Sequence, residues 1–203
     1  YDKHLLAPWT VGICKYYKGW NAFMDKLPDG WLYCDADGSQ FDSSLTPCLL
    51  NAVLEIRLEM MEKWDIGERM LQNLYTEIIY TPIATPDGTV VKKFKGNNSG
   101  QPSTVVDNTL MVVLAMNYSL AKLNISYEAM DSRIRYFANG DDLIIAVNPV
   151  GGEQILDSLQ DSFSELGLNY DFNDRTYNKE QLSFMSHQAL WDGDMYIPKI
   201  KAE

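Results

Sequence analysis

Apolar and polar residues alternate along the chain in the patterns typical of short strands and amphipathic helices. A buried strand is predicted at residues 31–34, and Thr46 followed by Pro47 signals the start of the next helix. Two apolar-rich runs, residues 134–138 and 143–147, flank an Asn-Gly pair, the strongest short signal for a β-hairpin. The pattern also predicts helices over residues 46–64, 68–79, 103–123 and 153–166, a hairpin turned at 85–88, and strands near residues 168–172, 182–185 and 195–197.

The order of these elements predicts the fold class. Strand, helix, hairpin, helix and strand follow one another, which favours an α+β fold with helices on one face of an antiparallel sheet. The most apolar helical segment, residues 110–115, is far shorter than the roughly 20 residues that span a membrane. We therefore expect no intrinsic membrane segment.

The composition is that of an ordinary globular protein, with 46% hydrophobic and 22% charged residues among 203. The net charge of −11 disfavours binding to nucleic acid, unless basic surfaces lie on parts of a larger protein outside this chain. The chain begins without Met or a signal-peptide pattern, so we expect it to be part of a longer protein. Its three cysteines share no metal-ligand spacing and are expected to be reduced, which weakly favours an intracellular setting.

The Asn-Gly turn places two carboxylates, Asp141 and Asp142, at the tip of the predicted hairpin. Carboxylates presented on a rigid turn are suited to hold Mg²⁺ against substrate phosphates. Asp37 and Asp42 follow the first predicted strand, and their spacing predicts that both lie in the turn leading to the next helix. If Asp37 and Asp141 lie side by side on adjacent strands, they can bind two Mg²⁺ ions that promote phosphoryl transfer.

Other interpretations apply to these polar segments. A calcium-binding EF-hand loop needs Gly at its sixth position and Glu at its twelfth, whereas counting from Asp35 puts Gly38 fourth and Thr46 twelfth, so this match fails. Ordinary turn chemistry at residues 35–39 remains an open alternative. The loop at residues 96–102 lacks the Gly-Lys-Ser/Thr ending of a P-loop, so it is either an ordinary loop before a helix or one that presents backbone N–H groups to an anion or a sugar.

Three segments in a fixed order carry a resemblance to a known family. Residues 37–42 resemble motif A of the RNA-dependent RNA polymerases of positive-strand RNA viruses, and Gly140-Asp141-Asp142 resembles their motif C. Ser99-Gly100 with Thr104 and Asn108 is similar to their motif B. The longer phrases at residues 34–44 and 96–104 resemble the nuclear inclusion b polymerases of potyviruses, which are released from a viral polyprotein, and the resemblance extends over residues 8–199.

The resemblance implies a right-hand polymerase palm, built on a ferredoxin-like antiparallel sheet with helices packed on one face. It implies that residues 1–30 lead from the fingers to the palm and that residues 31–80 form the palm around motif A. Residues 81–102 would form a fingers-like hairpin and the motif B loop, and residues 103–203 the palm with motifs B to E. The upstream fingers and the thumb would lie outside these residues.

The resemblance also implies the roles of individual residues. Asp37, Asp141 and Asp142 match the catalytic, metal-binding aspartates, which hold two Mg²⁺ or Mn²⁺ ions. Reverse transcriptases carry a bulky aromatic residue where Asp42 stands, so Asp42 favours ribonucleotides. A carboxylate and an amide can both engage a ribose 2′-hydroxyl, which is donor and acceptor together. The residues that match the nucleotide- and ribose-binding group are Asp42, Ser99, Gly100, Thr104 and Asn108.

Two positions match less closely. Related polymerases carry a motif D Lys proposed to protonate the leaving pyrophosphate, but that position is Arg175 here, with Lys179 four residues later. Arginine is a poor proton donor near neutral pH, so Arg175 and Lys179 are candidates for stabilising the leaving group rather than assigned acids. Residues 184–187, which end in His187, resemble the motif E turn that grips the primer strand.

The expected function is RNA-directed RNA synthesis in viral genome replication. The implied partners are template RNA, primer or nascent RNA, ribonucleoside triphosphates and other viral replication proteins. The implied location is the host cytoplasm, in viral replication complexes, and the resemblance also allows the nucleus. Alternatives are a reverse transcriptase or other palm-fold polymerase, and a non-catalytic acidic metal-binding module. Because the triphosphate-holding fingers and the thumb would lie outside these residues, we expect the isolated chain to be inactive.

Overall fold

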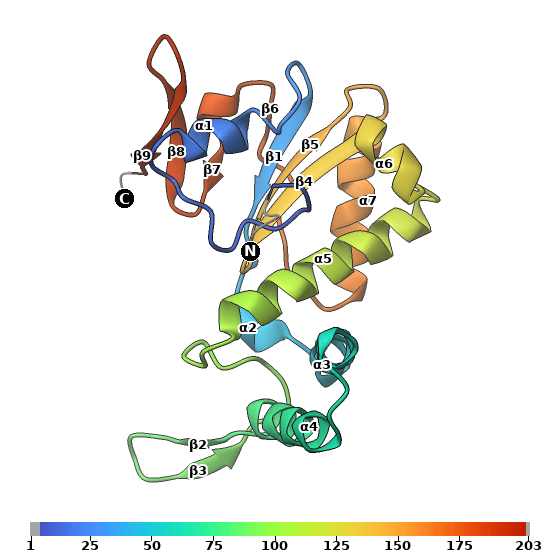
Figure 1. The fold of residues 1–203 in the computed structure, drawn as a ribbon, viewed down its shortest axis with the longest axis vertical. Coiled ribbons are helices and arrows are strands. Elements are labelled where there is room, and N and C mark those ends of the chain that lie inside the picture. The colour runs from blue at the N-terminus through green and yellow to red at the C-terminus, as the bar shows by residue number, and fades with distance from the viewer. Residues whose placement is uncertain (1–4, 202–203) are drawn as a thin grey trace.

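The computed structural model describes residues 5–201, and its centre is a four-stranded antiparallel sheet (Figure 1). β1 lies between β5 and β6, and its register with β5 runs from Leu32 opposite Val147 to Ala36 opposite Leu143. The chain is therefore a mixture of helices and antiparallel sheet, as the sequence predicted. The strands, in their order across the sheet, are β4 (Ile134–Asn139), β5 (Asp142–Val147), β1 (Leu32–Ala36) and β6 (Arg175–Thr176).

Two long helices, α5 (Thr104–Lys122) and α7 (Gly152–Glu165), cover one face of this sheet, and α3 (Pro47–Met60) packs against α5. Successive side chains of a strand point to opposite faces, so every second residue of β5 packs against these helices. The residues of β5 on this side are Leu143, Ile145 and Val147, all at most 1% exposed.

The opposite face of the sheet is buried as well, which the sequence did not predict. The short helix α1 (Gly19–Met24) and a small sheet of β7 (Ser183–Phe184), β8 (His187–Trp191) and β9 (Tyr196–Ile200) cover it (Figure 1). The ring of Phe23 lies 5.4 Å from that of Phe137 and 5.2 Å from that of Phe184. The central strands need cover on both faces because the residues of β5 between those that face the helices, Ile144 and Ala146, are also apolar and fully buried.

The remaining elements extend away from the central sheet. The helix α4 (Asp65–Ile79) packs against α3, and the hairpin of β2 (Pro82–Ala84) and β3 (Val90–Lys92) follows it at the bottom of Figure 1. The short elements are α2 (Phe41–Ser44), α6 (Tyr127–Arg133) and a 3-10 turn, η1 (Lys179–Gln181).

The sequence predicted the type of most elements but not all of their ends. The start of α3 is confirmed, because Thr46 accepts the N–H of Leu49 at 3.3 Å and Pro47 opens the helix. The helix was expected to reach residue 64, but it ends at Met60, and Trp64 is the N-cap of α4 instead. The hairpin at residues 85–88 and the helices α5 and α7 lie where the pattern placed them, within one residue at each helix end.

The strand predicted near residues 168–172 is wrong. Tyr170 makes only an isolated bridge with Gly38, and the edge strand β6 comes later in the chain. The side chain of Gln160 replaces a neighbouring strand, because its amide donates to the carbonyl of Tyr170 at 2.5 Å and accepts the N–H of Phe172 at 3.2 Å. The alternating apolar residues of this segment therefore pack against α7 without forming a ladder.

The helix α5 is, within residues 5–201, the one helix long and apolar enough to span a membrane by length and composition alone. Half of its most apolar window is buried inside the protein, where the helix packs on β4, α3 and α7. Core helices satisfy the same test, and four of its side chains are completely buried in the helical face of the core: Met111, Val112, Ala115 and Met116. The apolar composition of α5 is thus accounted for by its packing.

Candidate active site

The hairpin between β4 and β5 presents the two adjacent carboxylates at its tip. Asn139 and Asp142 pair as the last and first residues of the two strands, so the turn residues are Gly140 and Asp141. The sequence placed the turn one residue earlier, at Asn139-Gly140. Of the two turn residues only Gly140 has a positive φ, +64°, a conformation that residues with a side chain rarely adopt.

Asp37 lies beside this tip. It follows the last residue of β1, and Ala36 is opposite Leu143, so continuing the same register by one residue brings Asp37 opposite Asp142. Asp37 and Asp142 also line one open cavity of about 610 Å³ at the edge of the sheet. The sheet therefore brings together Asp37 and Asp142, which belong to segments that are far apart in the sequence.

The charges of the three carboxylates repel one another, and Asp141 and Asp142 are half-buried whereas Asp37 is exposed. Burial, followed by the charges of Asp37 and Asp141, raises the pKa of Asp142 to about 6. Burial and then the charge of Asp37 also raise the pKa of Asp141. Such a site attracts a cation, because a positive charge offsets the repulsion between the carboxylates and compensates for the hydration that they lose on burial.

Three contacts from outside the hairpin hold its tip in place, and the sequence pattern revealed none of them. Thr109 of α5 accepts the buried N–H of Gly140 at 2.8 Å. Tyr170 donates its hydroxyl to the carbonyl of Asp141 at 2.5 Å. The N–H of Met185, in the turn between β7 and β8, donates to the Asp142 carboxylate at 3.2 Å.

A lysine from the N-terminal segment lies next to this turn. The amino group of Lys15 donates to the carbonyl of Met185 at 3.1 Å and lies 3.2 Å from Nδ1 of His187. Burial lowers the pKa of Lys15, and the charge of Asp142 opposes that shift. Nδ1 of His187 lies 2.6 Å from the carbonyl of Met185 and also contacts Lys15. His187 is thus attached to the turn that resembles the primer-gripping motif E.

A second group of predicted residues converges on Asp42. The Asn108 side-chain amide donates to one oxygen of the Asp42 carboxylate at 2.7 Å, and the hydroxyl of Ser99 donates to the other oxygen. Asp42 was expected in the turn before the helix, but it lies inside the four-residue helix α2. The polypeptide turns into a helix earlier than predicted because Gln40, with φ +50°, already forms the left-handed N-cap.

Thr104 and Gly100 belong to the same loop without contacting Asp42. The hydroxyl of Thr104 lies 2.7 Å from the carbonyl of Asn98 and 2.9 Å from that of Gln101. Thr104 therefore ties the loop to the first turn of α5. Gly100 is exposed, and a Cβ atom there would meet no atom within 4 Å.

The two candidate cations of motif D lie apart from the carboxylate cavity. Neither Arg175 nor Lys179 lines it. Arg175 forms ion pairs with Glu153 and with Asp157 of α7, the second at 2.6 Å. The amino group of Lys179 is buried, where it lies 2.6 Å from Asp29 and donates to the carbonyl of Met24 at 3.1 Å.

The carboxylates of this site fit a divalent metal ion that takes some of its ligands from the protein and the others from water and a substrate. In the part of the chain that the structure describes, no three His, Cys, Asp or Glu side chains lie close enough to hold a metal ion by themselves. Mg²⁺ does not need such a cage, since it commonly binds one or two carboxylates and completes its shell with water and substrate phosphates. The hard oxygen donors of Asp37, Asp141 and Asp142 match that requirement.

Comparison with known proteins agrees with this geometry. The family model described as viral RNA-dependent RNA polymerase matches residues 1–203. Over all 203 residues the chain is 84% identical to the genome polyprotein of Ornithogalum mosaic virus, of which it covers 18%. It is 64% identical to the genome polyproteins of Tobacco vein mottling virus and Plum pox potyvirus (isolate NAT), of which it covers 7% and 6%. The chain therefore spans less than a fifth of the length of these polyproteins. It belongs to the viral RNA-dependent RNA polymerase family.

Proposed function

We propose that this chain is the palm region of an RNA-directed RNA polymerase, which transfers nucleotides from ribonucleoside triphosphates to a growing RNA in viral genome replication. The observation that carries the proposal is the register of β1 with β5, because it places Asp37 beside Asp142 at the edge of the sheet. Family membership supports the same reaction.

The topology supports the finer description of the fold as a ferredoxin-like palm. Along the chain, β1 leads to α5 after an insertion that holds α2 to α4 and the β2–β3 hairpin. The short helix α6, the β4–β5 hairpin, α7 and β6 follow, and the strand order is β4-β5-β1-β6. This is the βαββαβ arrangement with its two helices on one face. We also propose the division expected from the sequence: a lead-in at residues 1–30, palm at 31–80 and 103–203, and a fingers-like segment at 81–102.

In this proposal Asp37 and Asp141 hold two Mg²⁺ or Mn²⁺ ions, with Asp142 as the supporting acid. When bound, the ions supply an activated attacking hydroxyl and stabilise charge on the leaving oxygen. The chain itself fixes the turn and one of its carboxylates, because the backbone carbonyl of Asp141 is tied to Tyr170 and the Asp142 carboxylate to the N–H of Met185. Rigid placement of charged groups is the main contribution that a protein makes to phosphoryl transfer.

Asp42 and Asn108 would select ribose. Both oxygens of the Asp42 carboxylate face hydrogen-bond donors, so an incoming 2′-hydroxyl that replaces the exposed Ser99 hydroxyl finds a fixed acceptor. Gly100 leaves open space beside this point. Thr104 contributes by shaping the loop. The same residues disfavour a reverse transcriptase, because a deoxyribose has no 2′-hydroxyl to donate to Asp42 and gains nothing from this acceptor.

Arg175 is a better candidate than Lys179 for placing positive charge near the leaving pyrophosphate. The side chain of Arg175 is 18% exposed, whereas that of Lys179 is 6% exposed and is enclosed by its partners. For the complete protein we propose template RNA, primer or nascent RNA, ribonucleoside triphosphates and other viral replication proteins as partners. We propose the host cytoplasm, in replication complexes, as its location, with the nucleus as an additional one.

The test is primer extension on an RNA template by the intact polymerase that contains this chain. We expect incorporation of ribonucleotides that Asp141→Ala lowers by several orders of magnitude while the protein stays folded. Preferred incorporation of deoxynucleotides would indicate a reverse transcriptase. Binding of Mg²⁺ without any nucleotide incorporation would indicate a non-catalytic metal-binding module.

A further inference from the structure

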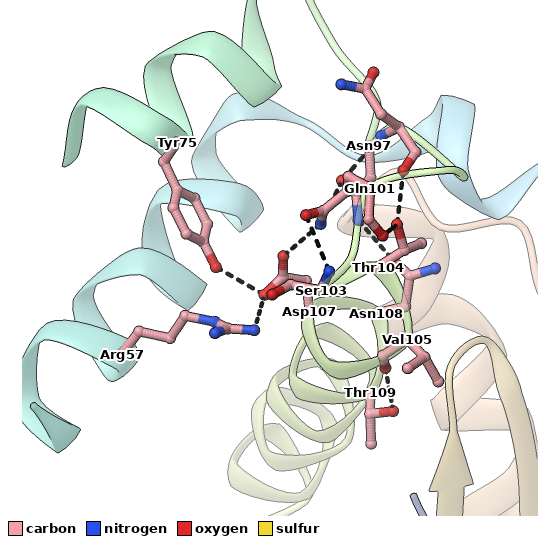
Figure 2. A network of polar contacts seen from close by, with 11 residues as sticks. Arg57, Tyr75, Asn97, Gln101, Ser103, Thr104, Val105, Asp107, Asn108 and Thr109 are labelled. Carbon is pink, nitrogen blue, oxygen red and sulfur yellow. Dashed lines mark hydrogen bonds and ion pairs between the residues drawn. The ribbon is translucent and has the colours of Figure 1, made fainter. Parts of the chain in front are cut away.

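A charged residue is completely buried where the loop before α5 meets the helices α3 and α4. Asp107 of α5 has no exposed side-chain surface, and the hydroxyl of Tyr75 donates to its Oδ1 at 2.7 Å (Figure 2). The Arg57 guanidinium lies 2.6 Å from the same oxygen but is not aligned as a hydrogen bond. Burial of an ion pair is costly, and replacing it with apolar residues often costs nothing, so stability alone does not explain it.

The second oxygen of Asp107 binds the loop. Gln101 donates its side-chain amide to Asp107 Oδ2 at 2.8 Å, and its carbonyl end accepts the N–H of Ser103 at 3.2 Å (Figure 2). An ionised carboxylate can only accept hydrogen bonds, and a backbone N–H can only donate. These two partners therefore fix which end of the Gln101 amide faces which way.

The same orientation is passed on through two more amides. Gln101 also donates to the Asn97 side-chain oxygen at 3.4 Å, and the N–H of Asn98 donates to that oxygen at 2.9 Å. The NH₂ group of Asn97 consequently faces the Asn108 oxygen, at 3.0 Å, and the NH₂ group of Asn108 faces Asp42, at 2.7 Å. The chain of amides thus runs between two carboxylates that only accept.

We propose that Asp107 is a positioning residue for ribose selection, acting through Gln101, Asn97 and Asn108 on Asp42. The proposal rests on the proposed function of the Asp42–Asn108 pair. Without an acceptor at residue 107, the Gln101 amide loses one of the two partners that fix its orientation, and its NH₂ group loses its shortest hydrogen bond. Asn97 is then held by fewer contacts, so Asn108 is positioned less firmly and fixes the Asp42 carboxylate less rigidly.

The test compares discrimination between ATP and 2′-deoxyATP by the intact polymerase. Asp107→Asn and Gln101→Met each interrupt the chain of amides, and we expect either to lower the ratio of the two kcat/KM values by roughly tenfold, the loss of about one ordered hydrogen bond. The matched controls are Asp131→Asn, which removes the exposed ion pair with Arg135, and Gln72→Met on the exposed face of α4. Both controls should keep the wild-type ratio.

A merely structural role predicts a different result, because lower stability reduces the use of both nucleotides by the same factor and leaves their ratio unchanged. An unchanged ratio in the folded variants would overturn the proposal. Gln101 is partly exposed and Met has a similar shape, so Gln101→Met keeps the test open if Asp107→Asn fails to fold. If the wild-type enzyme does not favour ATP at all, the proposed function fails instead.

Discussion

The hydroxyl oxygen of Thr109 accepts the backbone N–H of Gly140 at 2.8 Å, and this joins the second turn of α5 to the tip of the β4–β5 hairpin. The Thr109 hydroxyl in turn donates to the carbonyl of Val105 at 2.6 Å, so it is both a donor and an acceptor (Figure 2). Thr109 is completely buried. The helix that carries Asn108 and the turn that carries Asp141 are therefore held in one rigid unit.

Thr109→Val tests this link, because valine keeps the shape of threonine but cannot accept the N–H of Gly140. A buried N–H without a partner costs about 1–3 kcal/mol, so we expect a loss of that order in the free energy of unfolding. In the intact polymerase, turnover should fall because the hairpin tip loses its anchor. The matched control is Thr76→Val, an exposed threonine on α4 whose hydroxyl also donates within its helix. Equal stability losses in the two variants would contradict the predicted role.

Asp37 is expected to contribute to metal binding even without nucleotide. Asp37→Asn keeps the size of the side chain but removes its charge, and we expect the affinity for Mn²⁺ to fall about tenfold or more, as for loss of one charged ligand. Paramagnetic resonance of free Mn²⁺ during titration of the protein measures this affinity. Asp161→Asn, at an exposed position of α7, is the control. An unchanged affinity in Asp37→Asn would argue against the proposed ligand.

Asp142 should make the metal-free protein less stable as the pH rises. Its pKa is about 6 in the folded protein and 3.8 ordinarily. Below pH 3.8 the group is protonated in both states and costs nothing, whereas above about 6 it is ionised in both and the folded state carries the full penalty. Stability from this group is therefore lost between those two values as the pH increases.

Asp142→Asn removes this penalty. At pH 7.5 we expect the variant to be more stable than the parent by on the order of 2 kcal/mol, and the gain should vanish near pH 3.5. Urea unfolding in the presence of a chelator measures both values. The exposed Asp161→Asn should show no such dependence on pH. A constant gain at both pH values would show that packing rather than charge is responsible.

The parts of the site that could be predicted from the sequence depend on local signals. The Asn-Gly turn and the Thr46-Pro47 helix start act on their own backbone, so their positions were readable to within a few residues. The resemblance supplied the rest of the site, since nothing in the spacing of Asp37 and Asp141 shows that β1 pairs with β5.

The supporting contacts could not be predicted because they join segments that are far apart in the chain. Thr109 binds a residue 31 positions away, and Lys15 binds one 170 positions away. The wrong strand near residues 168–172 has a similar cause. Its alternating pattern is that of a strand, but a single side chain, Gln160, satisfies the backbone groups that a neighbouring strand would need.

Lys15 is expected to hold down the pKa of Asp142. Its amino group donates to the carbonyl of Met185, whose N–H donates to the Asp142 carboxylate, and its charge opposes the effect of burial on that carboxyl. We expect Lys15→Met to raise the pKa of Asp142 above its present value of about 6, as followed by nuclear magnetic resonance of the side-chain carboxyl without metal. Lys26→Met, at an exposed position, should leave it unchanged. If the pKa of Asp142 did not move in Lys15→Met, the lysine would serve only to hold the Met185 turn.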